Sequence, residues 1–418
     1  MKKTLKIQIE NIAKLAKSAS GVLAILPTAK KNEILKDLAA ALWSGKFVIL
    51  KANKKDLFAA KSKGQAFIDR LSLDEARIKQ MADSLLKIAK LKDPLGEVLR
   101  AWNTPGGLNI QKVRVPIGVV AIIYESRPNV TADCIGLCFK SGNSVILRGG
   151  SEAINSNLAI FSALKKVMRE HRLPEGAINL VATTDRRAVD YLLKLDGYID
   201  VVIPRGGEEL IKKVVRVSRI PVIKHYKGIC HVYVDEDADL NMAQNICFNA
   251  KVQRPGVCNA MESMLVHRGV AARFLPGMLK QFKDAGVQIR GCALTQKIAK
   301  WAKRATEKDY RTEYLDLILS VKVVEDLDAA IAHINAYGSH HSDSIVTENN
   351  NGAAKFLKQV DSACVYLNAS TRFTDGNQFG MGAEIGISTD KLHARGPMAL
   401  EELTTYKYLV YGCGQVRE

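Results

Sequence analysis

One cysteine lies in a turn that could make its sulfur reactive. The stretch KVQRPGVCNAMES, residues 251–263, places Cys258 just after a Pro-Gly pair and before small polar residues. Such a turn can expose the sulfur and aim backbone N–H groups at it, which a nucleophilic thiol requires. A structural cysteine packs as a small, inert hydrophobic side chain and needs no such turn. On this stretch alone the structural interpretation is the commoner one, so the rest of the chain must decide.

Two Arg-Gly-Gly turns could bind phosphate groups. SVILRGGSEA (144–153) and DVVIPRGGEEL (200–210) each read as an apolar strand, then Arg-Gly-Gly, then a helix that begins with an acid. Glycines allow close backbone approach, and the first N–H groups of a helix lack partners and favour anions. Neither turn is a G-x-G-x-x-G fingerprint or a P-loop. A nucleotide site on neighbouring strand ends therefore stays open beside plain strand–helix turns, in which Glu152, Glu208 and Glu209 only serve the helix dipole.

The remaining cysteines predict neither a metal site nor disulfides. No CxxC pair or regular framework occurs among the eight cysteines, which indicates reduced thiols and a cytoplasmic protein. Cys134 and Cys138 are one helical turn apart, but no second pair and no nearby histidine completes a ligand set. We therefore expect both thiols in the core and no bound metal.

The composition is that of an ordinary globular protein with a strongly basic first part. The 418 residues suffice for two or three domains, 47% of them are hydrophobic, and no apolar run reaches the roughly 18 residues of a membrane span. Residues 1–92 hold 20 Lys and Arg against 8 Asp and Glu, the larger part of the net charge of +18. Their lysines lie on polar helix faces without interleaved aromatic residues or a nucleic-acid-binding motif, so we expect no nucleic-acid and no membrane partner.

The first ninety residues predict helices, and a hairpin follows them. In LSLDEARIKQMADSLLKIAKL, Ser72 and Glu75 have the spacing of a capping box. The helix that this box would begin carries four apolar residues on one face: Ile78, Met81, Leu85 and Ile88. RAWNTPGGLNIQKVRVPIG then places Pro-Gly-Gly between two alternating runs, which predicts a β-hairpin.

From residue 117 onward, short apolar runs alternate with helical patterns. IGVVAIIY, NSVILR, AINLVA, YIDVVIP and PVIKHY are rich in Val and Ile, which predicts parallel strands with helices on both faces. A second series runs from ICHVYVD to ACVYLN, so we expect two α/β lobes that meet near residues 224–230. The tail TTYKYLVYGCGQVRE predicts a strand that pairs with the hairpin or with another subunit.

The order of these features resembles the aldehyde dehydrogenase superfamily, in which a thiol turn lies downstream of a glycine-turned α/β lobe. VEDLDAAIAHINAYGSHHSDSI (324–345) resembles the signature of the γ-glutamyl phosphate reductase family, also called glutamate-5-semialdehyde dehydrogenases. Further segments are similar to that family: YESRPNVTADC, LRGGSEA, NASTRFTDG, GMGAEIGIST and LHARGPM. The resemblance covers nearly the whole chain, and a signature of this length rarely arises by chance.

The resemblance implies an aldehyde-dehydrogenase-like α/β fold. Its parts are a Rossmann-like cofactor lobe and a catalytic lobe, each built on a parallel sheet, and a small oligomerisation hairpin. The implied bounds are 1–99 and 116–226 for the NADPH-binding domain, 227–385 for the catalytic domain, and 100–115 with 404–418 for the hairpin and tail. Residues 386–403 return to a lobe that the resemblance does not identify.

The resemblance also implies an activity. The family uses NADPH to reduce L-γ-glutamyl 5-phosphate to glutamate 5-semialdehyde with release of phosphate, the second step of proline synthesis, and Cys258 corresponds to its nucleophile. A homo-oligomer, and hand-over of the unstable acyl phosphate from glutamate 5-kinase, are expected with it. The residues implied at the cofactor are Arg148, Gly149, Gly150 and Ser151 at the 2′-phosphate turn, Gly206 and Gly207 at the pyrophosphate, and Glu313 at the nicotinamide ribose.

Two positions depart from the wider superfamily. Where other members bind the oxyanion with an asparagine beside the cysteine's own N–H, this chain has Ser126, in YESRP. Where hydrolytic members carry a glutamate that activates water, it has His225, in HYKGICH, 33 residues before Cys258. Such a base would destroy a thioester that must reach a hydride, so its absence favours reduction. His225 is either a catalytic participant or, more commonly for a histidine, structural.

Other candidate residues rest on charge and position. The thiolate could be helped by Arg254, by backbone N–H groups or by a helix beginning near Asn259, which is itself a catalytic candidate. The signature histidines His333 and His341 are expected to pack rather than to catalyse. The candidates for the amino-acid end of the substrate are Glu125, Arg127, Arg372 and Asp375.

Two other functions stay open. One is a CoA-linked or hydrolytic aldehyde dehydrogenase, against which the missing glutamate and the long signature weigh. The other is a basic nucleic-acid-binding protein that has kept an enzyme fold, which tight binding to nucleic acid at physiological salt would favour.

Overall fold

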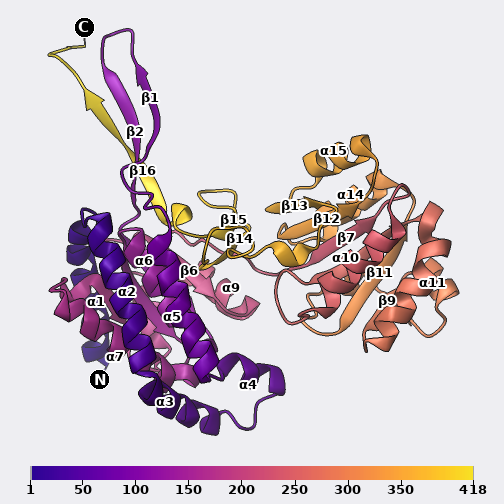
Figure 1. Ribbon diagram of the computed structural model, residues 1–418, viewed down its shortest axis with the longest axis horizontal. Helices are drawn as coiled ribbons and strands as arrows, with labels where there is room; N and C mark the ends of the chain where they lie inside the picture. Colours follow the sequence, from indigo (N-terminus) through magenta and orange to yellow (C-terminus); the bar gives the residue numbers. More distant parts are fainter. Residues whose placement is uncertain (1, 418) are drawn as a thin grey trace. The chain divides into compact units, whose positions relative to one another are not determined.

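The computed structural model describes residues 2–417, which form two compact units (Figure 1). Unit 1 holds the described residues up to Lys224, together with Gly380–Gly386 and those from Met398 onward. Unit 2 holds His225–Phe379 and Ile387–Pro397. Each unit contains its own parallel sheet with helices, so the predicted α/β class with two lobes is confirmed.

Unit 1 begins with the helices that the sequence predicts. They are α1 (Lys2–Leu23), α2 (Thr28–Ser44), α3 (Lys46–Ala59), α4 (Gln65–Leu71) and α5 (Glu75–Lys90). The predicted apolar face of α5 is buried, since Ile78, Leu85 and Ile88 have no exposed surface. In the part of the chain from Lys2 to Arg417, no helix is both long and apolar enough to cross a lipid bilayer.

The predicted start of α5 is wrong by two residues. Asp74, not Ser72, is the N-cap, and its side chain accepts a hydrogen bond from the backbone N–H of Arg77 at 2.7 Å. The Ser72 hydroxyl instead donates to the Ile68 carbonyl at the end of α4. Both residues could cap a helix, but Ser72 ends α4 as its C-cap, which leaves Asp74 to begin α5.

We expect Asp74→Ala to lower the free energy of unfolding by about 0.5–2 kcal/mol, because the first turn of α5 loses its side-chain acceptor. Ser72→Ala is the matched control and should have a smaller effect, because the Ser72 hydroxyl caps no helix start. Urea denaturation of both variants measures the difference. Equal losses would contradict the assignment of the cap.

A four-stranded parallel sheet forms the centre of unit 1. Its strands lie in the order β5-β4-β3-β6, with the bounds β3 (Val119–Tyr124), β4 (Ser144–Gly149), β5 (Ile178–Leu180) and β6 (Val201–Arg205). The accompanying helices are α6 (Asn129–Lys140), α7 (Ile154–Glu170), α8 (Arg187–Leu192) and α9 (Glu208–Val217), with single 3₁₀ turns η1 (Ser151–Ala153) and η2 (Glu175–Ala177). Cys134 and Cys138 are buried free thiols in α6, and burial raises the pKa of each.

Two predictions about this sheet need correction. PVIKHY (221–226) forms no strand, and only Val222 bridges to Val202. The two glycine turns do not follow adjacent strands, because β3 lies between β4 and β6. The end of β3 is therefore flanked by both turns.

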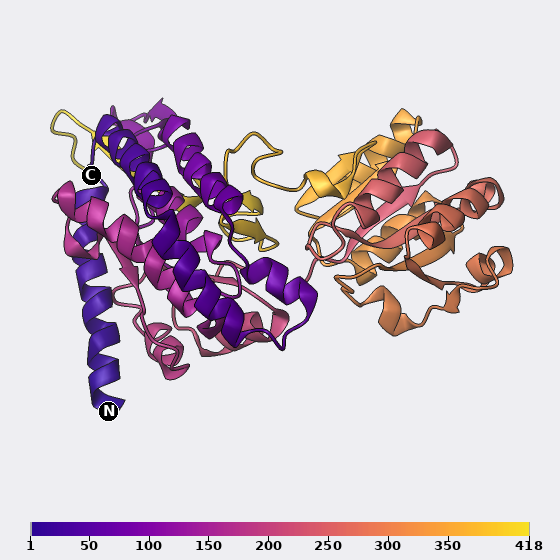
Figure 2. The same cartoon turned by 60° about the horizontal axis from the view of Figure 1, so that its bottom comes forward.

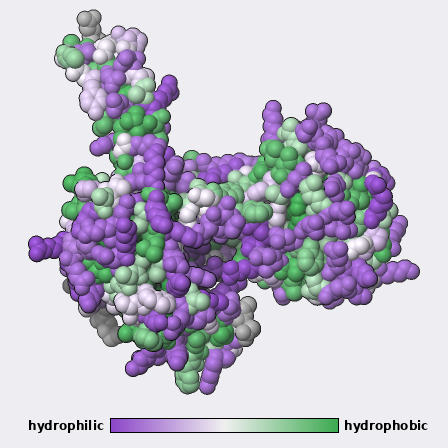
Figure 3. Space-filling model, viewed as in Figure 1, coloured by the Kyte–Doolittle hydropathy of each residue, from purple (hydrophilic) through white to green (hydrophobic). Residues whose placement is uncertain are grey.

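The hairpin and the tail form one antiparallel ribbon in unit 1. Its order is β1 (Val98–Asn103), β2 (Asn109–Pro116) and β16 (Thr404–Tyr411), so the tail pairs with the hairpin, one of the two partners that the sequence left open. Tyr406, Tyr408 and Val410 of β16 are about half exposed. Figure 3 shows hydrophobic side chains at the surface of this ribbon.

Unit 2 is built on a seven-stranded parallel sheet of order β10-β9-β11-β8-β7-β12-β13. The strands are β7 (Cys230–Val234), β8 (Met261–His267), β9 (Gln288–Gly291), β10 (Lys303–Arg304), β11 (Ile318–Val324), β12 (Ser342–Val346) and β13 (Cys364–Leu367). The helices are α10 (Leu240–Val252), α11 (Arg268–Asp284), α12 (Ala293–Ile298), α13 (Glu307–Tyr310), α14 (Leu327–Tyr337) and α15 (Asn350–Gln359). The 3₁₀ turn η3 (Thr371–Phe373) also lies in unit 2, whereas η4 (Glu401–Leu403) lies in unit 1. The short strands β14 (Gly386–Ser388) and β15 (Gly396–Met398) form a separate two-stranded sheet.

Both faces of this sheet are covered (Figure 2). Val232 and Val234 of β7 pack in the core cluster that contains residues of α10 and α11. Tyr233, between them, packs in the cluster that contains residues of α14 and α15. Because successive side chains of a strand alternate between faces, the buried apolar residues Val232, Tyr233 and Val234 of β7 require helices on both sides.

Candidate active site

Cys258 lies in the turn between α10 and β8. The turn comprises residues 253–260, and Cys258 is a free, partly exposed thiol. The chain runs from it directly into β8, so the helix suggested to begin near Asn259 is wrong. The stabilisation of a thiolate must come from side chains and backbone N–H groups instead.

The η3 segment holds this turn in place. The Arg372 guanidinium donates from Nε to Gln253 Oε1 at 2.8 Å and from Nη1 to the Asn259 side-chain oxygen. Asn259 is buried, its amide donates to the Thr374 carbonyl at 2.8 Å, and its own carbonyl accepts from the Thr371 hydroxyl. The Asn259 side chain is therefore engaged in fixing the turn.

The positive charge of Arg372 lies near the thiol. Burial lowers the pKa of Arg372 and the charge of Arg254 lowers it further, whereas the Cys258 side chain acts in the opposite direction. Asp375, the other candidate in this segment, is acidic and accepts from the backbone N–H of Asn377 at 2.9 Å, so it caps its own turn. Of the two candidates for the substrate's amino-acid end in unit 2, Arg372 is the one joined to the thiol turn.

Gly228 packs directly against the thiol turn from the other side. A Cβ atom on Gly228 would lie 1.9 Å from the Cys258 carbonyl oxygen and 2.6 Å from its Cα. The neighbouring Cys230 thiol donates to the same carbonyl at 3.2 Å, and burial raises the pKa of Cys230 well above its usual value. Cys230 is therefore a neutral support for the turn. The sequence singled out neither residue, although both lie in HYKGICH beside His225.

Glu313 belongs to the same group of residues. It lies in the segment between α13 and β11, and its side chain accepts a hydrogen bond from the Gly228 N–H at 2.9 Å. Within unit 2 the structure thus brings together Cys258, its backbone support at Gly228, and the carboxylate that the resemblance assigns to the nicotinamide ribose.

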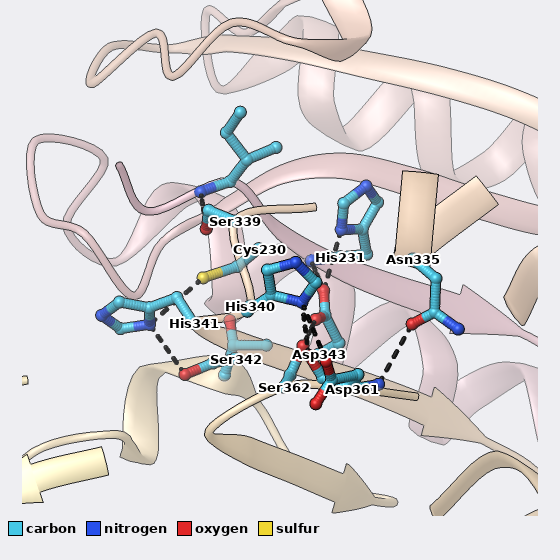
Figure 4. Close-up of polar contacts among 12 residues, drawn as sticks. Cys230, His231, Asn335, Ser339, His340, His341, Ser342, Asp343, Asp361 and Ser362 are labelled. Atoms are coloured by element: carbon cyan, nitrogen blue, oxygen red, sulfur yellow. Dashed lines mark hydrogen bonds and ion pairs between the residues drawn. The ribbon is translucent and has the colours of Figure 1, made fainter. Parts of the chain in front are cut away.

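The signature histidine His341 lies beside Cys230 and Ser342 (Figure 4). His341 Nδ1 lies 2.9 Å from the Ser342 hydroxyl and 3.7 Å from the Cys230 sulfur. The His225 ring is 5.8 Å from the His341 ring, and His225 Nδ1 lies 2.9 Å from the Ile387 carbonyl. His225 is therefore oriented by the backbone of its own unit.

His333 is a packing residue. It is buried, it stacks on the Tyr337 ring at 4.4 Å, and its Nδ1 lies 3.2 Å from Lys322 Nζ. Burial lowers the pKa of His333 to about 2, and the charge of Lys322 contributes to this shift. The imidazole therefore stays neutral at physiological pH, in agreement with the expected packing role.

In unit 1, the second glycine turn already receives an anion. Gly207 is the N-cap of α9, and its N–H donates to the Glu125 carboxylate at 2.9 Å. A Cβ on Gly206 would lie 2.3 Å from the same carboxylate oxygen. Glu125, a candidate for the substrate end, thus occupies the position where a phosphate oxygen would accept the same hydrogen bond.

The first glycine turn is tightly built around Glu152. The Glu152 carboxylate accepts from the backbone N–H of Ser126 at 2.7 Å and from its hydroxyl at 2.9 Å. Ser126 has a left-handed backbone with φ of 47°. A Cβ on Gly150 would lie 2.2 Å from Glu152. The hydrogen bonds to Ser126 show that this carboxylate binds the segment after β3 rather than only serving the helix dipole. Arg127 directly follows Ser126 in the chain and is half-buried.

Arg148 is buried beneath this turn. Its guanidinium donates to the carbonyls of Gly149 at 3.0 Å and Thr184 at 3.4 Å, and burial lowers its pKa. Its buried Nε has no hydrogen-bond partner among residues 2–417. Ser151 and Arg186 are exposed, and the charge of Arg186 acts on Arg148. Arg186 is a cation at this site that the sequence did not single out.

These donors fit an anionic dinucleotide. A helix N-terminus that holds a carboxylate, glycines beside which carboxylate oxygens occupy the Cβ positions of Gly150 and Gly206, and a buried guanidinium with an unused N–H are suited to phosphate oxygens. The two turns flank β3, as a ligand extended across the carboxyl ends of parallel strands requires.

Comparisons with known proteins agree with this fold. The model of the aldehyde dehydrogenase family matches residues 2–291. The gamma-glutamyl phosphate reductases of Caldanaerobacter subterraneus subsp. tengcongensis and Thermodesulfovibrio yellowstonii are 57% and 55% identical, each over 99% of this chain and 100% of their own length. The crystal structure of gamma-glutamyl phosphate reductase from Thermotoga maritima has a TM-score of 0.95 at 47% identity and covers 98% of this chain and 100% of its own. An acetylating aldehyde dehydrogenase from Geobacillus thermoglucosidasius, 15% identical with a TM-score of 0.72 over 99% of this chain and 98% of its own, shares the fold. The chain therefore belongs to the aldehyde dehydrogenase family and, within it, to the gamma-glutamyl phosphate reductases.

Proposed function

We propose that this protein reduces L-γ-glutamyl 5-phosphate to L-glutamate 5-semialdehyde with NADPH and releases phosphate, the second step of proline biosynthesis. The observation that carries the proposal is the near-complete match to gamma-glutamyl phosphate reductases at 55–57% identity. The partly exposed Cys258, held in a tight turn beside Arg372 and Glu313, supports it.

Cys258 is the proposed nucleophile. Its thiolate attacks the acyl carbon, a carbon–sulfur bond forms, and the carbon–oxygen bond to phosphate breaks with its electron pair leaving on phosphate. The product is a glutamyl thioester of Cys258. Arg372 supplies a nearby positive charge for the thiolate or for an anionic group of the substrate, and the backbone N–H of Cys258 is a donor for the oxyanion. Ser126 stays the predicted second donor.

When bound, NADPH supplies the hydride that reduces the thioester to the aldehyde. The proposed holding residues are Arg148, Gly149, Gly150 and Ser151 at the adenosine ribose and 2′-phosphate, Gly206 and Gly207 at the pyrophosphate, and Glu313 at the nicotinamide ribose. The carboxylate of Glu125 must leave the Gly207 N–H when a phosphate oxygen takes its place. For Glu125, holding the Gly207 N–H until the cofactor binds is an alternative to the predicted role at the amino-acid end of the substrate. Arg127 and Asp375 stay candidates for that end.

We propose that His225 does not activate water against the thioester, which therefore persists until it is reduced. It stands where hydrolytic relatives carry their glutamate, and its Nδ1 faces the Ile387 carbonyl. Phosphate release by thiol attack needs no water-activating base at this position, and a base there would hydrolyse the intermediate.

The test is the reverse reaction. Oxidation of glutamate 5-semialdehyde with NADP should require inorganic phosphate or arsenate, followed as NADPH formation at 340 nm. Neither water nor CoA should replace phosphate. Oxidation that proceeds at the same rate without phosphate would assign the chain to the hydrolytic members, and dependence on CoA would assign it to the CoA-linked ones.

Arg148→Gln tests the assignment of the 2′-phosphate. We expect it to raise the Michaelis constant for NADPH about tenfold and that for NADH much less, because only NADPH carries the additional phosphate. Steady-state kinetics with both cofactors measure this. An equal rise for both cofactors would show that Arg148 serves the architecture of the turn, through its bonds to Gly149 and Thr184, and not the phosphate.

The proposed setting is a cytoplasmic homo-oligomer. The exposed apolar side chains of β16 are suited to a second copy, and so is the outer edge of that strand, which pairs with no other strand among residues 2–417. Light scattering should therefore give a mass at least twice that of the 45.9 kDa chain, and a monomer at micromolar concentration would contradict the oligomer. Hand-over from glutamate 5-kinase follows from the instability of the acyl phosphate and is proposed on that chemical ground.

A further inference from the structure

A buried ion pair joins the two ends of the Cys258 turn. Lys251 Nζ lies 2.6 Å from Glu262 Oε2, and the two side chains are 0% and 1% exposed. Lys251 is the last residue but one of α10, and Glu262 is the second residue of β8. The pair therefore connects the elements from which the thiol turn enters and leaves.

This pair is not explained by stability. Burial raises the pKa of the Glu262 carboxyl to about 7 and lowers the pKa of Lys251, with each partner's charge opposing the shift of the other. The charge of Glu313 raises the pKa of Glu262 further, so the two carboxylates lie near one another. Apolar side chains of similar volume often serve a protein interior at least as well as a buried ion pair.

The second oxygen of Glu262 reaches the Glu313 segment. Glu262 Oε1 accepts from the backbone N–H of Leu315 at 3.0 Å. Leu315 has a left-handed backbone with φ of 53°, a conformation that a non-glycine residue keeps only where its surroundings impose it. The hydrogen bond to a buried, ion-paired carboxylate is such a constraint.

These contacts form a closed ring. Leu315 lies two residues after Glu313, the Glu313 carboxylate accepts from the Gly228 N–H, and Gly228 packs on the Cys258 backbone. From Cys258 the chain returns to Glu262 within four residues. A displacement of Glu262 would therefore move the Glu313 carboxylate and the thiol turn relative to each other.

We infer that Glu262, held by Lys251, is a positioning residue that fixes the Glu313 carboxylate relative to the Cys258 turn through the Leu315 N–H. The inference rests on the proposed function, because the fixed position of Glu313 matters only if Glu313 holds the nicotinamide ribose of NADPH beside the thiol. The Glu262 side chain is 1% exposed, so it is expected to act through Leu315 and not by contact with the cofactor or the substrate.

Two double variants isolate the Leu315 contact. Lys251→Met with Glu262→Gln removes both charges but keeps a side-chain oxygen for the Leu315 N–H. Lys251→Met with Glu262→Met removes both charges and that acceptor. We expect the second variant to bind NADPH about tenfold more weakly than the first, by fluorescence titration, with similar melting temperatures. Equal affinities in the two folded variants would overturn the inference.

A measurement on the unaltered protein covers the case in which a variant fails to fold. Hydrogen–deuterium exchange, followed by mass spectrometry of the peptide containing Leu315, should slow at least severalfold on saturation with NADPH, because the cofactor would hold Glu313 and with it the ring. Unchanged exchange in the cofactor-saturated protein would overturn the inference while leaving the proposed function untouched. Failure of the unaltered protein to bind NADPH would refute the proposed function and the inference with it.

Discussion

Cys258→Ala is expected to reduce the rate of NADPH oxidation with L-γ-glutamyl 5-phosphate by about 10³-fold or more, because no thioester can form without the sulfur. The fold should be preserved, since the turn is held by backbone and side-chain contacts of Asn259 rather than by the thiol. The absorbance of NADPH measures the rate, and a melting curve measures whether the fold is preserved. In the unaltered protein, substrate supplied without cofactor should leave a glutamyl adduct on Cys258, detectable by mass spectrometry.

Cys413→Ala provides the matched control. Cys413 is the exposed free thiol near the end of the chain, and its loss should leave both activity and the adduct unchanged. Substantial activity of Cys258→Ala, or healthy turnover of the unaltered protein without any adduct at Cys258, would remove this residue from the mechanism.

Local sequence patterns predicted the strands because burial on both faces demands long apolar runs. IGVVAIIY and ICHVYVD became β3 and β7, whose residues are all buried. The strand predicted at PVIKHY was wrong, because only Val222 forms a β-bridge. The rest of this segment connects unit 1 to unit 2. Apolar residues alone therefore do not distinguish a strand from a buried connection.

The candidate site was predictable only where its signal is local. The Pro-Gly turn before Cys258 can be read from consecutive residues. Arg372, in contrast, bonds to Gln253 across 119 residues, and Glu313 bonds to the Gly228 N–H across 85 residues. Such contacts are set by the order of strands in the sheet, which no periodicity in the sequence encodes. Gly228 and Glu262 were overlooked for this reason, although both lie in segments that the sequence singled out.

The overlooked Gly228 leads to the second large effect. Gly228→Ala is expected to lower kcat about 10²-fold, because its Cβ would lie 1.9 Å from the Cys258 carbonyl oxygen and must displace the turn. A displacement of roughly 1 Å at a reacting group costs about that factor in rate. The three nearest atoms are all backbone atoms of Cys258, so no side-chain rotation can relieve the overlap. Steady-state kinetics and the rate of Cys258 alkylation by iodoacetamide measure the consequence.

Gly277→Ala separates this effect from a general cost of adding a methyl group. Gly277 lies inside α11 of the same unit, and the nearest atom to its Cβ would be the Gln244 side-chain nitrogen at 3.4 Å, an ordinary contact. Alanine there should leave kcat unchanged and raise the free energy of unfolding by about 0.5–1 kcal/mol, because glycine is the poorer helix former. If Gly228→Ala retains full kcat in a folded protein, the backbone contact between Gly228 and the thiol turn does not position Cys258.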